Sequence, residues 1–156
     1  MSAAVKTSKK VNIRAMEPED ISSVLEIDRR ISGVRRAVTY KDLITGDIGG
    51  ELDLSFVAEI GDQVIGLLLG RLAYTGEPLI AAGLIQTLGV DPDYQKQGIA
   101  TGLVNAMLEH CRARGIDMVR TMVKENDSQL QGFFAHMGFR RGQLIDYTMS
   151  LRGQPK

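Results

Sequence analysis

Residues 84–114 read LIQTLGVDPDYQKQGIATGLVNAMLEHCRAR, and this stretch decides the fold. It begins as an apolar run that ends at Val90, and Asp91-Pro92-Asp93 then interrupts the run. From Gly98 onward the apolar residues recur at the spacing of one helix face: Ile99, Leu103, Val104, Met107, Leu108 and Cys111. Gly115 is a typical helix stop. We therefore predict a strand, a short polar connection and a long amphipathic helix.

The polar connection leads directly into the N-terminus of the predicted helix. Such a terminus has four backbone N–H groups without helical partners and the positive end of the helix dipole. Gly98 leaves room for an anion close to the backbone, and Ala100 adds little bulk. These features suit a phosphate or diphosphate group. The alternative is an ordinary strand–loop–helix turn that binds nothing.

The pattern Gln95-x-x-Gly98-x-Ala100, placed after this strand, resembles the acetyl-CoA signature of the GCN5-related N-acetyltransferases. The resemblance implies an acetyl-CoA-dependent N-acetyltransferase, with acetyl-CoA as acyl donor. The acceptor would be a primary amine: a protein N-terminus, a lysine or a small molecule. The implied cofactor-binding residues are Leu88, Gly89, Val90, Gln95, Lys96, Gln97, Gly98, Ile99, Ala100 and Thr101, followed by Asn126, Asp127 and Phe134.

Length and composition restrict the class of protein. The 156 residues suffice for one domain, and we predict a flexible arm over residues 1–10 and a single N-acetyltransferase domain over residues 11–152. Nineteen basic residues balance nineteen acidic ones, which argues against nucleic acid as a partner. Cys111 is the only cysteine, which fits a cytoplasmic protein. No apolar run is long enough for a membrane span, and neither His110 nor His136 has metal-ligand spacing.

The remaining chain alternates strand and helix patterns. Strands are predicted over residues 11–15, 54–60, 63–73, 81–90, 117–124, 139–144 and 145–151. Helices are predicted after Pro18, after a capping box at Thr39, after Gly98 and after Asn126 or Asp127. This order predicts an α/β fold with a single mixed, mostly antiparallel sheet flanked by helices, as in the acyl-CoA N-acyltransferases.

The resemblance assigns a second landmark, an Asn or Asp before the last helix and a Tyr ahead of a Gly-Phe pair. Counting back from residues 138–139, the Tyr position is Phe134, and the Asn position falls on Asp127 with Asn126 one residue early. Asn126 and Asp127 either contact the cofactor or cap the helix. Phe134 has no proton to give to the leaving thiolate, and the predicted central strand carries no Asp or Glu. No general acid or base is therefore assigned.

Three explanations are open for the missing acid and base. Water relays the protons, or Tyr147, Glu125 or His136 substitutes for them. Alternatively, the chain is a non-catalytic acyl-CoA-binding or regulatory domain. Because no nucleophile is evident, we expect direct attack by the amine in a ternary complex. Gly89 either marks a bulge whose N–H polarises the thioester carbonyl or simply relieves packing.

Four arginines, Arg29, Arg30, Arg35 and Arg36, cluster around the break between the first two predicted helices. They form either a basic rim that favours an acceptor with acidic groups or a solvated charged turn. The resemblance also implies a possible homodimer.

Overall fold

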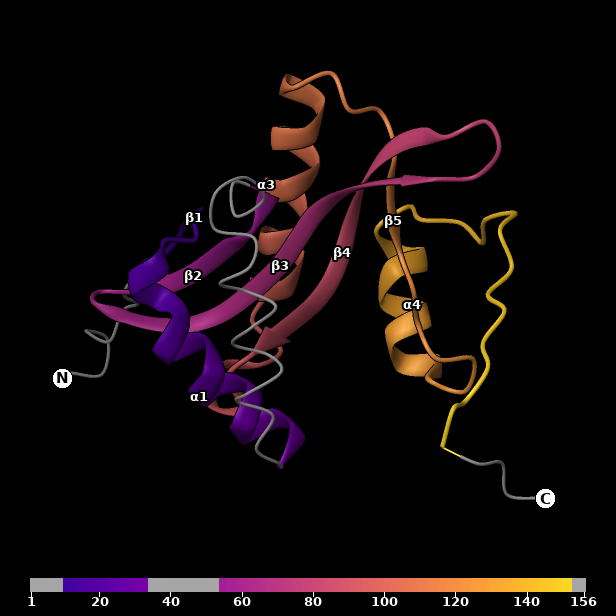
Figure 1. Ribbon diagram of the computed structural model, residues 1–156. Helices are drawn as coiled ribbons and strands as arrows, with labels where there is room; N and C mark the ends of the chain where they lie inside the picture. The colour runs from indigo at the N-terminus through magenta and orange to yellow at the C-terminus, as the bar shows by residue number, and fades with distance from the viewer. Residues whose placement is uncertain (1–9, 34–53, 153–156) are drawn as a thin grey trace, which may run out of the picture. The chain divides into compact units, whose positions relative to one another are not determined.

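The computed structural model describes residues 10–33 and 54–152, and the chain falls into two compact units, residues 1–122 and 123–156. In the described part of the first unit, five strands form one sheet in the order β1-β2-β3-β4-β5 (Figure 1). They are β1 (Val11–Ala15), β2 (Phe56–Ile60), β3 (Gln63–Thr75), β4 (Ile80–Val90) and β5 (Val119–Thr121). The first four pair antiparallel with their neighbours, and β5 joins β4 in parallel. The prediction of a mixed, mostly antiparallel sheet is confirmed.

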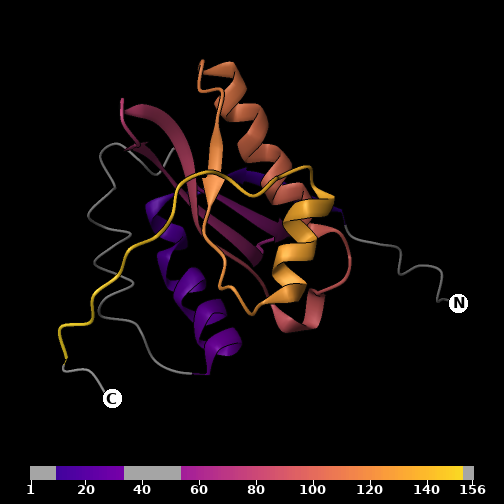
Figure 2. The ribbon, with the colours of Figure 1, turned by 90° about the vertical axis from the view of Figure 1, so that its right-hand side faces the viewer.

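Two helices cover opposite faces of this sheet. The 3₁₀ turn η2 (Pro18–Asp20) leads into α1 (Ile21–Ser32), which ends at Gly33 with a left-handed φ of 76°. The turn η4 (Pro92–Tyr94) precedes α3 (Ile99–Ala113). Figure 2 shows α1 and α3 on either side of the strands. The sheet is therefore buried on both faces.

The apolar patterns of the sequence form the two halves of the core. On one face, Met16 and the inner side of α1 pack against β2 and β3 through Val24, Ile27, Val57, Leu67 and Leu69. On the other face, α3 buries Ile99, Leu103, Val104, Met107 and Cys111, as its spacing predicts. Gly70 of β3 allows α3 to pack closely, because a Cβ there would lie 3.0 Å from Cε of Met107, and it would also lie 2.5 Å from the Leu54 carbonyl oxygen.

A β-bulge divides β4 into two parts. Leu69 of β3 pairs with Thr87, but its neighbour Gly70 pairs with Ile85, so Gln86 is the extra residue. The predicted bulge at Gly89 is wrong, because Gly89 pairs in regular register with Leu67. The packing alternative holds instead, since a Cβ at Gly89 would lie 2.9 Å from Cδ1 of Ile31 in α1.

Several predicted boundaries shift, and some predictions fall outside the described residues. The strand predicted over residues 54–60 begins at Phe56, the next extends to Thr75, and that predicted over 117–124 shortens to Val119–Thr121. The helix predicted after Thr39, most of the predicted arm, and Arg35 and Arg36 lie outside the described residues.

The second unit contains α4 (Ser128–His136). The strands predicted over residues 139–144 and 145–151 are wrong, because the chain there forms neither strand nor helix. Its large apolar side chains alternate but are largely exposed: Ile145, Tyr147, Met149 and Leu151. A period-two pattern shows which side of a strand would be buried, but a strand also needs a partner edge that no local pattern supplies.

Among the described helices, none combines the length and the apolar character that crossing a membrane requires.

Candidate active site

The C-terminal half of β4 has an open edge among the described strands. β5 pairs with β4 only at residues 83–85, whereas β3 pairs with it as far as Val90. Beyond that point the Asp91 N–H donates to the Ile65 carbonyl of β3 at 2.8 Å. Because alternate residues of an antiparallel ladder turn both backbone polar groups towards the partner, those of Leu88 and Val90 face the open edge. An extended molecule can add to this edge as a further strand.

The same alternation decides the role of Gly89. Its N–H faces β3, as that of Asp91 does, so it is not the donor at the open edge. The oxyanion role predicted for Gly89 therefore does not fit, and the outward N–H groups beside it are the available donors.

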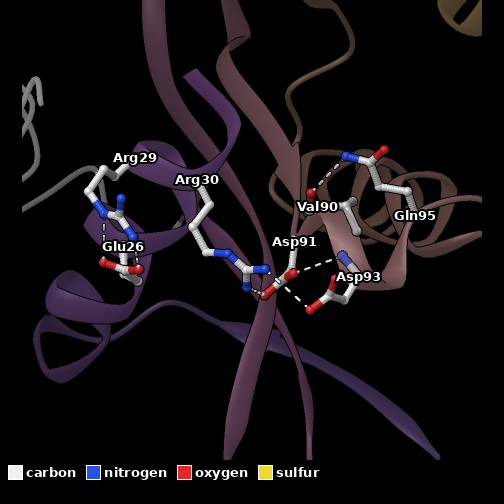
Figure 3. Close-up of polar contacts among 7 residues, drawn as sticks. All are labelled: Glu26, Arg29, Arg30, Val90, Asp91, Asp93 and Gln95. Carbon is white, nitrogen blue, oxygen red and sulfur yellow. Dashed lines mark hydrogen bonds and ion pairs between the residues drawn. The ribbon is translucent and has the colours of Figure 1, made fainter. Parts of the chain in front are cut away.

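The loop between β4 and α3 reverses direction through left-handed backbone. Lys96 has a φ of 64° and Gly98, the N-cap of α3, a φ of 81°. The Gln95 side chain ties the loop to the strand end, because its Nε2 donates to the Val90 carbonyl at 3.1 Å (Figure 3). The predicted contact residues Gln95, Lys96, Gln97 and Gly98 are all exposed.

The N-terminus of α3 is open to an anion. Its first helical hydrogen bond runs from the Gly102 N–H to the Gly98 carbonyl at 3.0 Å. Three N–H groups thus precede the helical ladder, those of Ile99, Ala100 and Thr101. No side chain caps the terminus, no acid lies in its first turn, and a Cβ at Gly98 would meet nothing within 4 Å. The positive end of the dipole is therefore available to a phosphate group.

Arg30 of α1 anchors the start of this loop, which sequence reasoning missed (Figure 3). Its Nη1 lies 2.7 Å from Asp91 Oδ2, and its Nη2 lies 3.2 Å from Asp93 Oδ2. The Asp91 side chain is only 5% exposed, and its Oδ1 accepts the Asp93 N–H at 2.9 Å, which fixes the turn η4. Arg30 thus neutralises two carboxylates close to the open helix terminus. No local pattern could reveal a pair 61 residues apart.

The predicted basic rim is not formed by the two described arginines of the cluster. Arg30 is held by its two aspartates, and Arg29 pairs with exposed Glu26 within α1. The hydrogen bond from Arg29 lowers the pKa of the Glu26 carboxyl.

Residues 21–139 match the acetyltransferase (GNAT) family. The chain belongs to this family. As a member of this family, the chain is an acyltransferase with acetyl-CoA as its donor. Among residues 10–33 and 54–152, no three His, Cys, Asp or Glu side chains gather to hold a metal ion.

Solved structures share the fold of this acetyltransferase. An aminoglycoside N-acetyltransferase in complex with CoA has a TM-score of 0.75 and 14% identity, covering 94% of this chain and 99% of that one. The ribosomal-protein-S18-alanine N-acetyltransferase from Escherichia coli has a TM-score of 0.72 and 16% identity, covering 86% of this chain and 80% of that one. A transcriptional regulator from Bacillus halodurans C-125 has a TM-score of 0.71 and 18% identity, covering 88% of this chain and 100% of that one. At these identities the likeness shows the fold alone.

The remaining predicted site residues of the acetyltransferase lie in the second unit. Asp127 caps α4, because its Oδ1 accepts the Leu130 N–H at 3.0 Å, while Asn126 is exposed. Phe134 is buried and meets Phe133 and Phe139 edge to face, with ring centroids 5.1 Å apart in both pairs. This aromatic environment suits a Phe at the position that the sequence resemblance assigns to a Tyr.

The three substitute acids or bases are all exposed. Tyr147 lies in the irregular C-terminal segment, and His136 ends α4. Glu125 contributes its backbone carbonyl, which accepts a hydrogen bond from Gln131 Nε2 at 2.8 Å.

Proposed function

We propose that this acetyltransferase transfers an acetyl group from acetyl-CoA to a primary amine by direct attack in a ternary complex. The amine would belong to a protein N-terminus, a lysine or a small molecule. The observation that carries the proposal is the meeting of two open features, the β4 edge at Leu88 and Val90 and the N-terminus of α3. The helix terminus suits the diphosphate of coenzyme A, and the strand edge suits its amide-containing arm.

The proposed chemistry follows from this placement. The amine nitrogen attacks the thioester carbon, the carbon–sulfur bond breaks, and the thiolate leaves and takes up a proton. An outward N–H of Leu88 or Val90 is positioned to stabilise the oxyanion that develops on the carbonyl oxygen. Cys111 is excluded as a nucleophile, because its side chain is buried between α3 and the sheet.

We infer that water carries the protons. A thiol has a pKa of about 8.5, so it leaves without strong acid assistance. Phe134 cannot donate a proton, and β4 contains no Asp or Glu. Gln86, the bulge residue, exposes a polar side chain at the start of the open edge, where it can orient a water molecule.

The deciding experiment combines binding and turnover. Calorimetry measures the affinity for acetyl-CoA, and a panel of amines and peptides is screened by release of free thiol. Turnover supports the proposal. Tight binding without turnover of any amine would instead favour a non-catalytic acyl-CoA-binding or regulatory domain, a candidate motivated by Phe134.

We also propose a cytoplasmic location, because the only cysteine is buried in the core and can form no internal disulfide.

A further inference from the structure

Two arginines flank β4 on one face of the sheet. Arg71 of β3 pairs with Leu84 of β4, and Leu84 pairs in turn with Arg120 of β5. Cross-strand partners point to the same face, so the three side chains stand side by side. Arg71, Leu84 and Arg120 thus form a row across three strands. Arg71 follows Leu67 and Leu69 at intervals of two along β3, so the row lies on the face that α1 covers at Leu67 and Leu69.

Neither arginine has a counter-ion among the described residues. In the described part of the chain, the arginines that form ion pairs are Arg14, Arg29 and Arg30. Arg71 and Arg120 are both half-buried, and the Nε of Arg120 is buried without a hydrogen-bond partner. Leaving a buried charged donor unsatisfied is costly, so a ligand that satisfies it gains affinity.

The row lies where the acceptor must arrive. The pairing of β4 with β5 ends at Ile85, and the open edge proposed to bind the donor begins at Gln86. The opposite face is filled by α3 at this level, since a Cβ at Gly83 would lie 2.9 Å from the sulfur of Cys111. The amine must therefore approach this end of the donor from the face that carries Arg71 and Arg120.

The spacing of the two arginines suits one small anionic group. They stand two strands apart, so their Cα atoms are separated by about 10 Å, and their long side chains can converge above Leu84. The guanidinium fork matches a carboxylate with two parallel hydrogen bonds. The neighbouring positions on this face, Ala73 and Ala82, are uncharged, so they offer no competing acid.

We propose that Arg71 and Arg120 bind a carboxylate carried by the acceptor, so that the enzyme selects acidic amines over neutral or polycationic ones. This inference rests on the proposed function. It predicts that a polycationic aminoglycoside is a poor acceptor for this chain.

The test uses three C-terminally amidated tripeptides with free N-termini: Ala-Glu-Glu, its isostere Ala-Gln-Gln, and Ala-Lys-Lys. The kcat/KM from thiol release should be about tenfold or more higher for the acidic peptide than for the isostere. Arg71→Gln and Arg120→Gln should each lower kcat/KM for the acidic peptide by about tenfold and leave the isostere unchanged. Lys at either position should restore part of the preference. Arg112→Gln, an exposed change on α3, is the matched control and should alter neither value.

Equilibrium binding separates failure of the subsite from failure of transfer. If no peptide is acetylated but calorimetry on the CoA-saturated protein shows arginine-dependent preference for the acidic peptide, the subsite stands and the proposed transfer fails. The subsite alone is overturned if Ala-Lys-Lys is acetylated as well as or better than Ala-Glu-Glu. It is also overturned if the Gln variants lower kcat/KM equally for Ala-Glu-Glu and Ala-Gln-Gln. Absence of any preference in both turnover and binding also overturns it.

Discussion

Replacing Arg30 with Met removes a cation from a buried carboxylate while keeping an unbranched side chain on α1. The lost contact with Asp91, at 2.7 Å to a side chain only 5% exposed, is a charge-assisted hydrogen bond to a buried group. Such a loss costs about 2–3 kcal/mol in the free energy of unfolding. The contact with Asp93 adds little, because that carboxylate is 72% exposed.

The same change should weaken coenzyme A binding. Without Arg30, the negative charge of Asp91 is uncompensated near the seat proposed for the diphosphate. A unit charge about 10 Å away at an effective dielectric of about 20 contributes ~1.7 kcal/mol. We therefore expect the Kd for acetyl-CoA to rise by about tenfold or slightly more.

Urea unfolding followed by circular dichroism measures the stability, and titration calorimetry measures the Kd for acetyl-CoA. Arg29→Met is the matched control, because the neighbouring arginine pairs only with exposed Glu26. The single variant Asp91→Asn and the double variant Arg30→Met/Asp91→Asn complete a double-mutant cycle that isolates the coupling energy of the pair. Our reasoning is refuted if Arg30→Met and Arg29→Met are equally stable and bind acetyl-CoA equally well.

Three further changes test other parts of the molecule. Gly98→Trp should abolish acetyl-CoA binding in calorimetry while the protein stays folded, since the side chain fills the anion seat and the left-handed φ costs only about 1–2 kcal/mol. Gly115→Trp, at the other end of α3 with a φ of 78°, is its control, and unchanged affinity in Gly98→Trp would place the seat elsewhere. Burial alone raises the pKa of Asp20, but its hydrogen bonds from Arg14 and from the Glu17 N–H outweigh burial and lower that pKa. A lowered pKa contributes stability above about pH 4 that is lost as the pH falls through the folded-state value, so Asp20→Asn should be less stable at pH 7 and show a shallower acid dependence in urea unfolding. A constant difference between the two proteins from pH 7 to pH 3 would contradict this. Phe134→Tyr should be tolerated and should match or exceed the original turnover; an unfolded or inactive variant would show that Phe134 does not occupy the family Tyr position.

The features predicted correctly from sequence are those that depend on local period. Residues 99–113 form a helix because their apolar side chains repeat every three or four positions, and the turn at Gly61 joins two alternating strands. The uncapped N-terminus of α3 was predictable from another local feature, because the glycine at the strand–helix junction has no side chain that could cap the helix.

The features that sequence reasoning missed depend on distant partners. The bulge falls on Gln86 rather than on Gly89, because the pairing with β3 decides which residue is extra. Arg30 reaches Asp91 across 61 positions of the chain. Residues 145–151 alternate as a strand would but have no strand partner in the described structure. In each case the local pattern is compatible with more than one outcome.

The extra residue at Gln86 divides β4 into two parts in which side chains alternate between the two faces of the sheet in opposite order. Ahead of the bulge, odd-numbered positions such as residue 83 face α3, because a Cβ at Gly83 would meet Cys111. Beyond it, even-numbered positions such as Val90, opposite Gly66, face α3. Deleting this one residue would place Ile85 and Thr87 in direct succession opposite Gly70 and Leu69, so both halves would keep their faces and only the bulge would be lost. Because the bulge also separates the half that pairs with β5 from the half with the open edge, the proposed acceptor subsite and the proposed donor-binding edge lie on opposite sides of it, and a substitution on one side leaves the strand pairing on the other side unchanged.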